Sequence, residues 1–252
     1  MKILISNDDG IRAAGLNALR ESLQDQYQLY VVAPDRERSA TGHKITLDRP
    51  LRVKEWTYPG SDTIGWEVDG TPADCVKLGL EALLPEPPDL VISGINFGPN
   101  LGTDVLYSGT VSAAVEGMIN DIPSIAISLA SHEFCDFTFS SEIIKKIVSI
   151  MDGGLSARTL LNINTPPRTP RGIKVTRLGD RRYVNIFDKR IDPRGRVYFW
   201  MAGEPFDLDK DDPETDVWAI RGGYISITPV QFDLTDYGFM EKLKNICSKI
   251  EV

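Results

Sequence analysis

Short apolar runs alternate with amphipathic stretches along the chain up to residue 165. Runs rich in Ile, Leu and Val are typical of strands buried in a parallel sheet, whereas spacing such as that of Leu16, Leu19 and Leu23 indicates the buried face of a helix. This alternation predicts an α/β fold with a Rossmann-like, doubly wound and mostly parallel sheet. The predicted strands cover residues 3–5, 29–33, 51–53, 64–66, 89–94, 124–127 and 160–164, and the predicted helices cover residues 16–23, 71–83, 110–118 and 140–151.

A proline-rich segment, residues 165–172, marks a change in this pattern. Beyond it the pattern predicts strands and turns and then one amphipathic helix, over residues 197–200, 224–227 and 236–250. We therefore expect an α/β core over residues 1–170. Residues 171–252 are expected to form a β-rich extension with a hairpin arm and a final helix, either as a separate unit or as an integral part of one domain.

Charge argues against a nucleic-acid partner. The formal net charge is −8, so the chain as a whole is not built to wrap a polyanion. Residues 168–196 hold ten basic side chains against three Asp, with Tyr183 and Phe187 between them, but residues 204–216 hold seven acids and Lys210. We interpret the two stretches as a self-complementary, solvated pair of segments.

The cysteines and the hydropathy indicate a cytoplasmic protein. Cys75, Cys135 and Cys247 are odd in number and far apart, which indicates a reducing compartment and no zinc site. The first apolar run is too short for a signal peptide, and no uncharged stretch reaches the roughly 18 residues of a membrane span. We expect no membrane partner.

Two adjacent carboxylates, Asp8 and Asp9, directly follow the first predicted strand. Neighbouring carboxylates repel each other, so a cation that neutralises them would be favoured. Ligands bind at the carboxyl ends of strands in open α/β sheets, which makes this pair a candidate site for a hard metal. The alternative is a solvated turn, because Asn-Asp-Asp-Gly is also good turn chemistry.

Three further polar loops follow predicted strands or open a helix, over residues 34–43, 94–102 and 107–112. Their hydroxyl and amide oxygens suit magnesium, manganese or calcium. The glycines at 94, 98 and 102 would let backbone approach a ligand closely. Ser108, Gly109 and Thr110 would offer N–H groups and hydroxyls to an anion at a helix N-terminus. Four such loops together predict a metal and phosphate site.

In combination these segments resemble the SurE family (survival protein E, a metal-dependent 5′-nucleotidase). The resemblance covers essentially the whole chain. The matching residues, in order, are Asn7-Asp8-Asp9-Gly10, Ala33-Pro34-Asp35-Arg36 leading to Ser39, Ser93-Gly94-Ile95-Asn96 with Gly98, Tyr107-Ser108-Gly109-Thr110-Val111-Ser112-Ala113-Ala114, and Ile227-Thr228-Pro229.

The resemblance implies a catalytic role for Asp8 and Asp9 and one divalent cation per subunit, most plausibly Mg²⁺ or Mn²⁺. The implied metal ligands are Asp8, Asp9, Ser39 and Asn96, and the implied phosphate-binding residues are Asn96, Ser108, Gly109 and Thr110. The implied reaction converts nucleoside monophosphates to nucleoside and phosphate, and some members also cleave 3′-nucleotides or short polyphosphate. The family also implies a homodimer or homotetramer that exchanges hairpins and the C-terminal helix, so we hypothesise an oligomerisation arm near residues 180–216.

Our mechanistic hypothesis is that a metal-bound water attacks phosphorus while Asp8 or Asp9 orients it or accepts its proton. His43, just past the second loop, is a candidate general acid with an ordinary loop role as the alternative. His132 lacks a partner in the pattern and is interpreted as a surface or core residue. Asp233 is interpreted as a helix cap and Cys75 as buried packing.

Other classes of protein stay open at this point. A phosphatase of the haloacid-dehalogenase type phosphorylates an Asp after the first strand, but it normally needs Asp-x-Asp rather than adjacent acids. A metal-dependent glycosyltransferase meets the same objection. A non-catalytic nucleotide-binding or assembly protein would use the same pocket without turnover, and fold alone does not decide among these.

Overall fold

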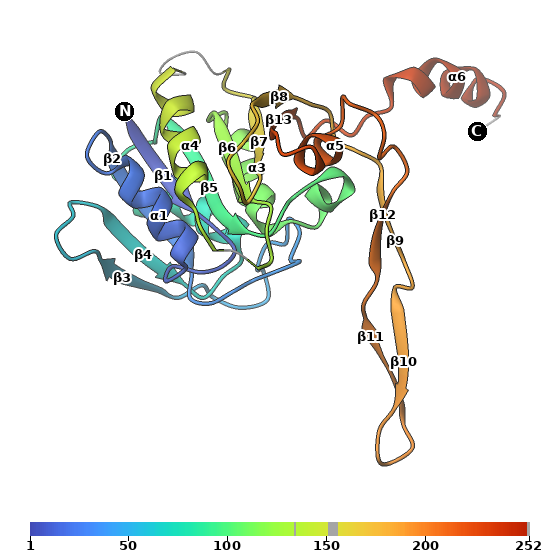
Figure 1. Cartoon of the computed structure of the whole chain (residues 1–252), viewed down its shortest axis with the longest axis horizontal. Coiled ribbons are helices and arrows are strands. Elements are labelled where there is room, and N and C mark those ends of the chain that lie inside the picture. Colours follow the sequence, from blue (N-terminus) through green and yellow to red (C-terminus); the bar gives the residue numbers. More distant parts are fainter. Residues whose placement is uncertain (134, 151–155, 251–252) are drawn as a thin grey trace.

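The computed structural model describes residues 1–133, 135–150 and 156–250. Within them, nine strands form one sheet in the order β3-β4-β2-β1-β5-β6-β7-β13-β8 (Figure 1). The strands are β1 (Lys2–Ser6), β2 (Gln28–Pro34), β3 (Val53–Thr57), β4 (Ile64–Val68), β5 (Leu90–Phe97), β6 (Ser124–Leu129), β7 (Leu160–Thr165), β8 (Ile173–Val175) and β13 (Ile225–Val230).

The order of the strands reverses at β1. Both β2 and β5 pair with β1 in parallel, on its two sides, so the connections that leave β1 and β5 diverge at the carboxyl ends of these strands. Such a switch point is where open α/β sheets bind ligands. Antiparallel pairing in the described sheet is confined to β3 with β4 and β13 with β7.

Helices cover both faces of the sheet. On one face, α1 (Ala14–Leu23) and α4 (Thr138–Ile150) pack on the layer that contains Ile3 and Ile5 of β1. On the other, α2 (Pro72–Leu78) and α3 (Gly109–Ile119) pack on the layer that contains Leu4. Alternate residues of β1 thus belong to the two cores on opposite faces of the sheet. Burial on both faces explains the continuous apolar sequence of the central strands.

The second part of the chain leaves the α/β body as a long two-stranded ribbon and a separate helix (Figure 1). In the ribbon, β10 pairs with β11 and β9 pairs with β12. The short helix α5 returns the chain to the sheet. The bounds are β9 (Arg181–Val184), β10 (Phe187–Ile191), β11 (Val197–Met201), β12 (Glu204–Asp207), α5 (Asp216–Arg221) and α6 (Tyr237–Cys247).

These elements confirm the predicted fold class, including the β-rich extension, the hairpin arm and the final helix. The predicted start of α2 is also confirmed, because Thr71 Oγ1 accepts from the N–H of Asp74 and the Asp74 carboxylate accepts from the N–H of Thr71. The predicted single helix over 71–83 is α2 followed by a π-helical turn, Gly79–Leu83.

Several boundaries differ from the prediction, and the starts of β3 and α4 are two examples. The strand predicted at 51–53 begins only at Val53, because the N–H of Arg52 donates to the Asp69 carboxylate, 2.9 Å away, instead of to a ladder partner. The helix predicted over 140–151 begins earlier, at Thr138, and residue 151 lies outside the described residues. No helix in the described part of the chain is long and apolar enough to span a bilayer.

Candidate active site

The first site segment is a tight turn at the carboxyl end of β1. The Asn7 side chain accepts from the N–H of Gly10 and donates to its carbonyl, both at 3.1 Å, which closes the turn that sequence chemistry predicts. Gly10 has φ +101°, a conformation that favours glycine. The turn holds Asp8 and Asp9 at the switch point between β1 and β5.

Asp8 lies against the N-terminus of α3. The Thr110 hydroxyl donates to Asp8 Oδ1 at 2.5 Å, and a Cβ atom on Gly109 would lie 2.7 Å from the Asp8 Cβ. Burial raises the pKa of the Asp8 carboxyl, although hydrogen bonds from Thr110 act in the opposite direction. The structure therefore brings together two segments about a hundred residues apart in sequence that the motif analysis assigned to metal and phosphate.

Asp9 is less enclosed than Asp8 and points toward β5. Its Oδ2 lies 3.4 Å from the backbone nitrogen of Phe97, next to Asn96. Burial, and then the negative charge of Asp8, raise the pKa of Asp9 to about 6. A carboxyl group with such a pKa can gain or lose a proton close to neutral pH.

The loop after β2 is tied to the same turn. The N–H of Arg38 donates to the Asp8 carbonyl at 2.7 Å, which fixes the backbone just before Ser39. The Ser39 hydroxyl donates to Glu37 at 2.6 Å, and the charge of Glu37 contributes to the raised pKa values of both Asp8 and Asp9. The sequence does not single out Glu37, because a charged residue in a polar loop carries no distinguishing pattern.

Asn96 is held by its own loop. Its side-chain nitrogen donates to the Gly98 carbonyl at 2.8 Å, so Oδ1 is the atom of this side chain that can bind a cation. The strand register shifts between Ser93 and Asn96, which interrupts regular pairing with β6 where the site begins. A Cβ atom on Gly94 would lie 2.3 Å from the Ile127 carbonyl oxygen, so this position accepts only glycine.

Ser108 is the N-cap of α3. Its Oγ accepts from the N–H of Val111 at 3.1 Å, which uses a lone pair and leaves the hydroxyl proton able to donate. The first turn of a helix also presents N–H groups that lack helical partners. Ser108 and Gly109 can therefore donate to an anion, whereas the Thr110 hydroxyl is committed to Asp8.

The donor set fits one divalent cation with oxygen ligands. In the described ranges, no three His, Cys, Asp or Glu side chains cluster closely enough to hold a metal. The carboxylates of Asp8 and Asp9, whose pKa values are raised, would be stabilised by a hard cation, and a hydroxyl and an amide oxygen would complete its ligands. Asp8, Asp9, Ser39 and Asn96 remain the predicted ligands.

His43 contacts Glu116 of α3 and not one of the predicted metal or phosphate ligands. Its Nε2 is 2.8 Å from Glu116 Oε2, and Lys77 donates to Glu116 Oε1 at 3.1 Å. Burial by itself raises the pKa of Glu116, but the bonds from His43 and Lys77 outweigh it and hold the pKa below its usual value. Glu116 is two turns along α3 from Ser108, so His43 fastens the loop after β2 to α3.

His132 is exposed, in agreement with its interpretation as a surface or core residue, and it lies beside the predicted metal loop. A Cβ atom on Gly98 would be 3.2 Å from His132 Cε1 and 3.7 Å from the Asn96 side-chain nitrogen, which places the exposed imidazole beside this loop. The interpretation of Cys75 as buried packing is confirmed, because it is fully buried in α2. The interpretation of Asp233 as a helix cap is wrong. Asp236 caps α6 by accepting from the N–H of Phe239, whereas Asp233 accepts from the N–H of Thr235 and the Tyr237 hydroxyl.

Known proteins resemble this chain in sequence and in fold. The family model for survival protein SurE matches residues 3–185. The 5′-nucleotidase SurE of Pelotomaculum thermopropionicum is 72% identical over 252 residues, which cover 100% of this chain and 97% of that protein. The 5′-nucleotidase SurE of Desulforudis audaxviator is 58% identical, with 97% and 96% covered. The crystal structure of the SurE protein from Aquifex aeolicus has a TM-score of 0.84 and 43% identity, and covers 98% of this chain and 99% of that one.

Proposed function

The chain belongs to the SurE family, and we propose that it hydrolyses nucleoside 5′-monophosphates at the edge where β1, β5 and α3 meet. It is a hydrolase of the metal-dependent 5′-nucleotidase type. The observation that carries the assignment of the site is the contact of Asp8 with Thr110 and Gly109, because it joins a carboxylate pair to an anion-binding helix N-terminus.

Asp8, Asp9, Ser39 and Asn96 would hold the divalent cation. When bound, the cation supplies charge compensation for the phosphoryl oxygens and lowers the pKa of a water molecule. Asp8 is fixed by Thr110 and keeps a single orientation. Asp9, the less enclosed carboxylate of the pair, would orient the attacking water and accept its proton.

The substrate phosphate would lie at the first turn of α3. The Ser108 hydroxyl and the N–H of Gly109 would donate to phosphoryl oxygens as negative charge develops on them. Thr110 would contribute by holding Asp8 beside the phosphate through its hydrogen bonds. Donors that are already in place before the reaction need no reorganisation. Gly109 is essential to this geometry because any side chain there would displace Asp8.

The leaving nucleoside alkoxide requires a proton. His43 was the sequence candidate, but its Nε2 contacts Glu116. His132 is exposed beside Gly98 and Asn96, so we assign the donor role to His132 and a positioning role to His43. His132→Gln should slow AMP hydrolysis by about tenfold or more and spare p-nitrophenyl phosphate, whose leaving group needs no proton. Equal losses on both substrates would contradict this assignment.

The first experiment measures phosphate release from a panel of nucleoside 5′-monophosphates with magnesium, manganese or chelator. We expect release that depends on metal and is lost in Asp9→Asn, while Asp62→Asn, a change of an exposed loop acid, retains it. Binding of nucleotide without release would instead support a non-catalytic role. The same panel, extended with 3′-nucleotides and short polyphosphate, defines the range of substrates.

The assembly and the compartment complete the proposal. We propose a homodimer or homotetramer that exchanges the β9–β12 ribbon and α6, because both elements expose large apolar side chains, including Phe199, Trp200 and Leu243. The three cysteines are free thiols, which supports a cytoplasmic location.

A further inference from the structure

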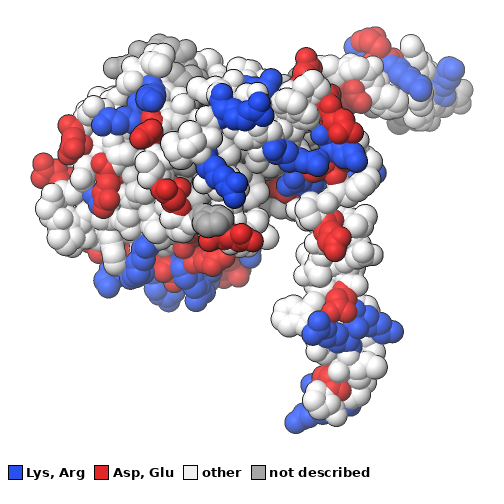
Figure 2. Space-filling model, viewed as in Figure 1, with Lys and Arg blue, Asp and Glu red and all other residues white. Residues whose placement is uncertain are grey.

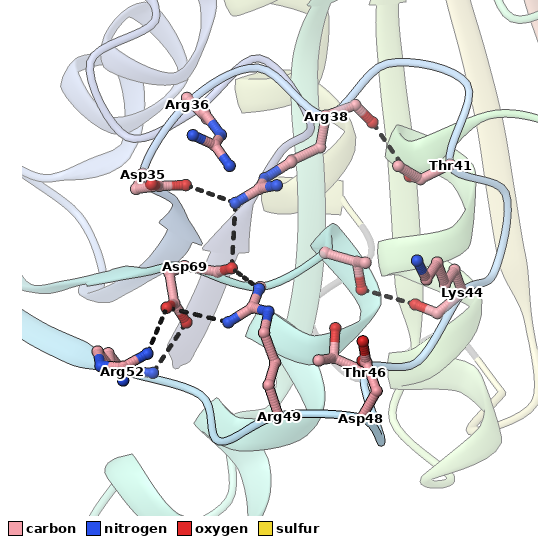
Figure 3. A pocket seen from close by; sticks show the side chains of 12 residues that line it. Asp35, Arg36, Arg38, Thr41, Lys44, Thr46, Asp48, Arg49, Arg52 and Asp69 are labelled. Carbon is pink, nitrogen blue, oxygen red and sulfur yellow. Dashed lines mark hydrogen bonds and ion pairs between the residues drawn. The ribbon is translucent and has the colours of Figure 1, made fainter.

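A cleft of about 520 Å³ opens next to the active site, at the carboxyl ends of β2 and β4. Its walls are almost entirely charged or hydroxyl side chains, and five of its lining residues are basic against three acidic ones. Figure 3 shows the loop after β2 on one side of the cleft and the segment before β3 on the other. The lining residues used below are Asp35, Arg36, Arg38, Lys44, Arg49, Arg52 and Asp69.

Three of the arginines are held in place by acids or carbonyls. Arg38 donates to Asp35 at 2.8 Å and to the Asp69 carbonyl at 3.0 Å. Arg49 and Arg52 both lie within ion-pair distance of the Asp69 carboxylate, at 3.0 and 3.6 Å. These contacts orient the guanidinium groups and limit how far they can move.

Arg36 and Lys44 provide the excess positive charge. Neither side chain has a hydrogen bond or ion pair within residues 1–133, 135–150 and 156–250. Both are exposed at the cleft. Figure 2 shows Lys and Arg side chains, with Asp and Glu among them, along the lower edge of the α/β body, where the loop after β2 runs in Figure 1. The cleft therefore combines fixed guanidinium groups with two cations that are available to a ligand.

The chemistry of the lining indicates which part of a substrate would enter. No aromatic side chain is among the lining residues, so the cleft lacks the stacking surface that a nucleobase favours. Planar guanidinium forks and a lysine ammonium are the usual partners of phosphate oxygens. We propose that this cleft is a subsite for a second phosphate group on a phosphorylated substrate.

The subsite is connected to the predicted metal site through the backbone of the loop after β2. The segment that carries Arg36 and Arg38 continues directly to Ser39, and the N–H of Arg38 donates to the Asp8 carbonyl. The backbone of Arg36 also lies within 3.3 Å of where a Cβ on Gly10 would be. In this proposal, a substrate with its scissile phosphate at α3 places its second anion in the cleft, where the anion would select among nucleotides.

The test compares competitors of AMP hydrolysis at a fixed concentration of free metal. Adenosine 3′,5′-bisphosphate carries its second phosphate on the sugar, and inorganic tripolyphosphate carries it along a phosphate chain, so the two distinguish the source of the second anion. In each of the variants Lys44→Ala and Arg36→Ala, the inhibition constant of at least one of these two competitors should rise by about tenfold relative to that of orthophosphate. Lys145→Ala, on α4 and away from the cleft, should leave this ratio unchanged.

The inference rests on the proposed nucleotidase activity, which AMP hydrolysis by the unaltered protein tests separately. Thermal unfolding of each variant shows that the exposed substitutions leave the fold intact. If neither competitor loses inhibition relative to orthophosphate in either cleft variant, the cleft does not bind a second phosphate and the proposal is wrong.

Discussion

Gly109 illustrates how a single missing side chain shapes the site. The space that a Cβ atom would need is taken by Asp8, with the Asp8 Cβ at 2.7 Å and Oδ2 at 2.9 Å. The close approach lets the carboxylate lie directly at the N-terminus of α3. Carboxylate and helix are thereby held as one unit, and the position tolerates no larger residue without a shift of Asp8.

Gly109→Ala is accordingly expected to lower kcat/KM for AMP by about 100-fold or more, because small displacements of catalytic groups carry losses of that size. Steady-state kinetics measure the loss, and the unfolding midpoint shows whether the fold is retained. Gly238→Ala, on the exposed helix α6, is the matched control, since its nearest neighbour is the Asp236 side chain at 3.3 Å. Unchanged kinetics in Gly109→Ala would show that Asp8 does not need its observed position.

The raised pKa of Asp9 predicts how metal binding depends on pH. A carboxyl group with a pKa of about 6 is mostly protonated below that pH, and the proton competes with the cation. The affinity for Mn²⁺ should therefore fall by about tenfold for each pH unit below the pKa and level off above it. Calorimetric titration across this range measures the effect, and an affinity independent of pH would argue that Asp9 is not a ligand.

Residue types and their order in the chain predict which loops form the site, but they do not predict the individual bonds. Asn-Asp-Asp-Gly after an apolar run predicted a turn, which the structure confirms, and Ser-Gly-Thr before a helical run predicted a helix start with free N–H groups for an anion. The commitment of the Thr110 hydroxyl to Asp8 and the contact of His43 with Glu116 join residues that are far apart in sequence. Such pairs depend on how helices pack on the sheet, which a single sequence does not encode locally.

At the scale of elements, α2 and α3 are joined by a buried carboxylate. Glu116 of α3 is bonded by Lys77 of α2 and by His43 of the loop that leads from β2. Its side chain is only 4% exposed, so the two bonds are what keep a charge in this position. The loop that carries Ser39 is thus fastened at Asp8 and again at Glu116.

Glu116→Gln should lower the free energy of unfolding at neutral pH by about 1–3 kcal/mol, because charged hydrogen bonds are lost. The folded-state pKa of Glu116 lies below its ordinary 4.5, so its ionised form stabilises the fold above that pH. This contribution disappears as the pH falls through the lower folded-state value. Urea unfolding should show a difference between the two proteins at neutral pH that narrows in acid, and a constant difference would contradict the assignment.

Periodicity predicted the elements of the core better than it predicted those of the extension. The central strands are buried on both faces, so their apolar runs are unbroken and easy to identify. Residues 187–191 of the ribbon are exposed on both faces, and a strand there has no periodic pattern to distinguish it from a loop. Pairing of β13 between β7 and β8 is likewise a property of the whole sheet and not of either segment.

At the scale of the whole molecule, the ribbon and α6 project from the body and carry apolar surface into solvent (Figure 1). Phe199 and Trp200 of β11 are 57% and 60% exposed. A two-stranded ribbon is only marginally stable by itself, so contact with a second copy would stabilise it. This arrangement supports the exchange of arms between subunits.

Replacing residues 187–201 by a short turn should therefore reduce the mass measured by light scattering, because the exposed aromatic surface of β10 and β11 is removed. Arg194→Ala, which changes an exposed residue at the tip and leaves the strands intact, should keep the mass of the unaltered protein. If the shortened protein has the same mass, the ribbon is not the contact between subunits.

The place of β13 in the sheet also matters while the protein is being synthesised. The ribbon and α5 separate β8 from β13 in the sequence, yet β13 lies between β7 and β8. Until residue 230 has left the ribosome, β7 has an open edge of unpaired N–H and C=O groups, which favours aggregation. The last sheet strand to be translated thus protects a core whose Asp8, Asn96 and Ser108 emerged long before it.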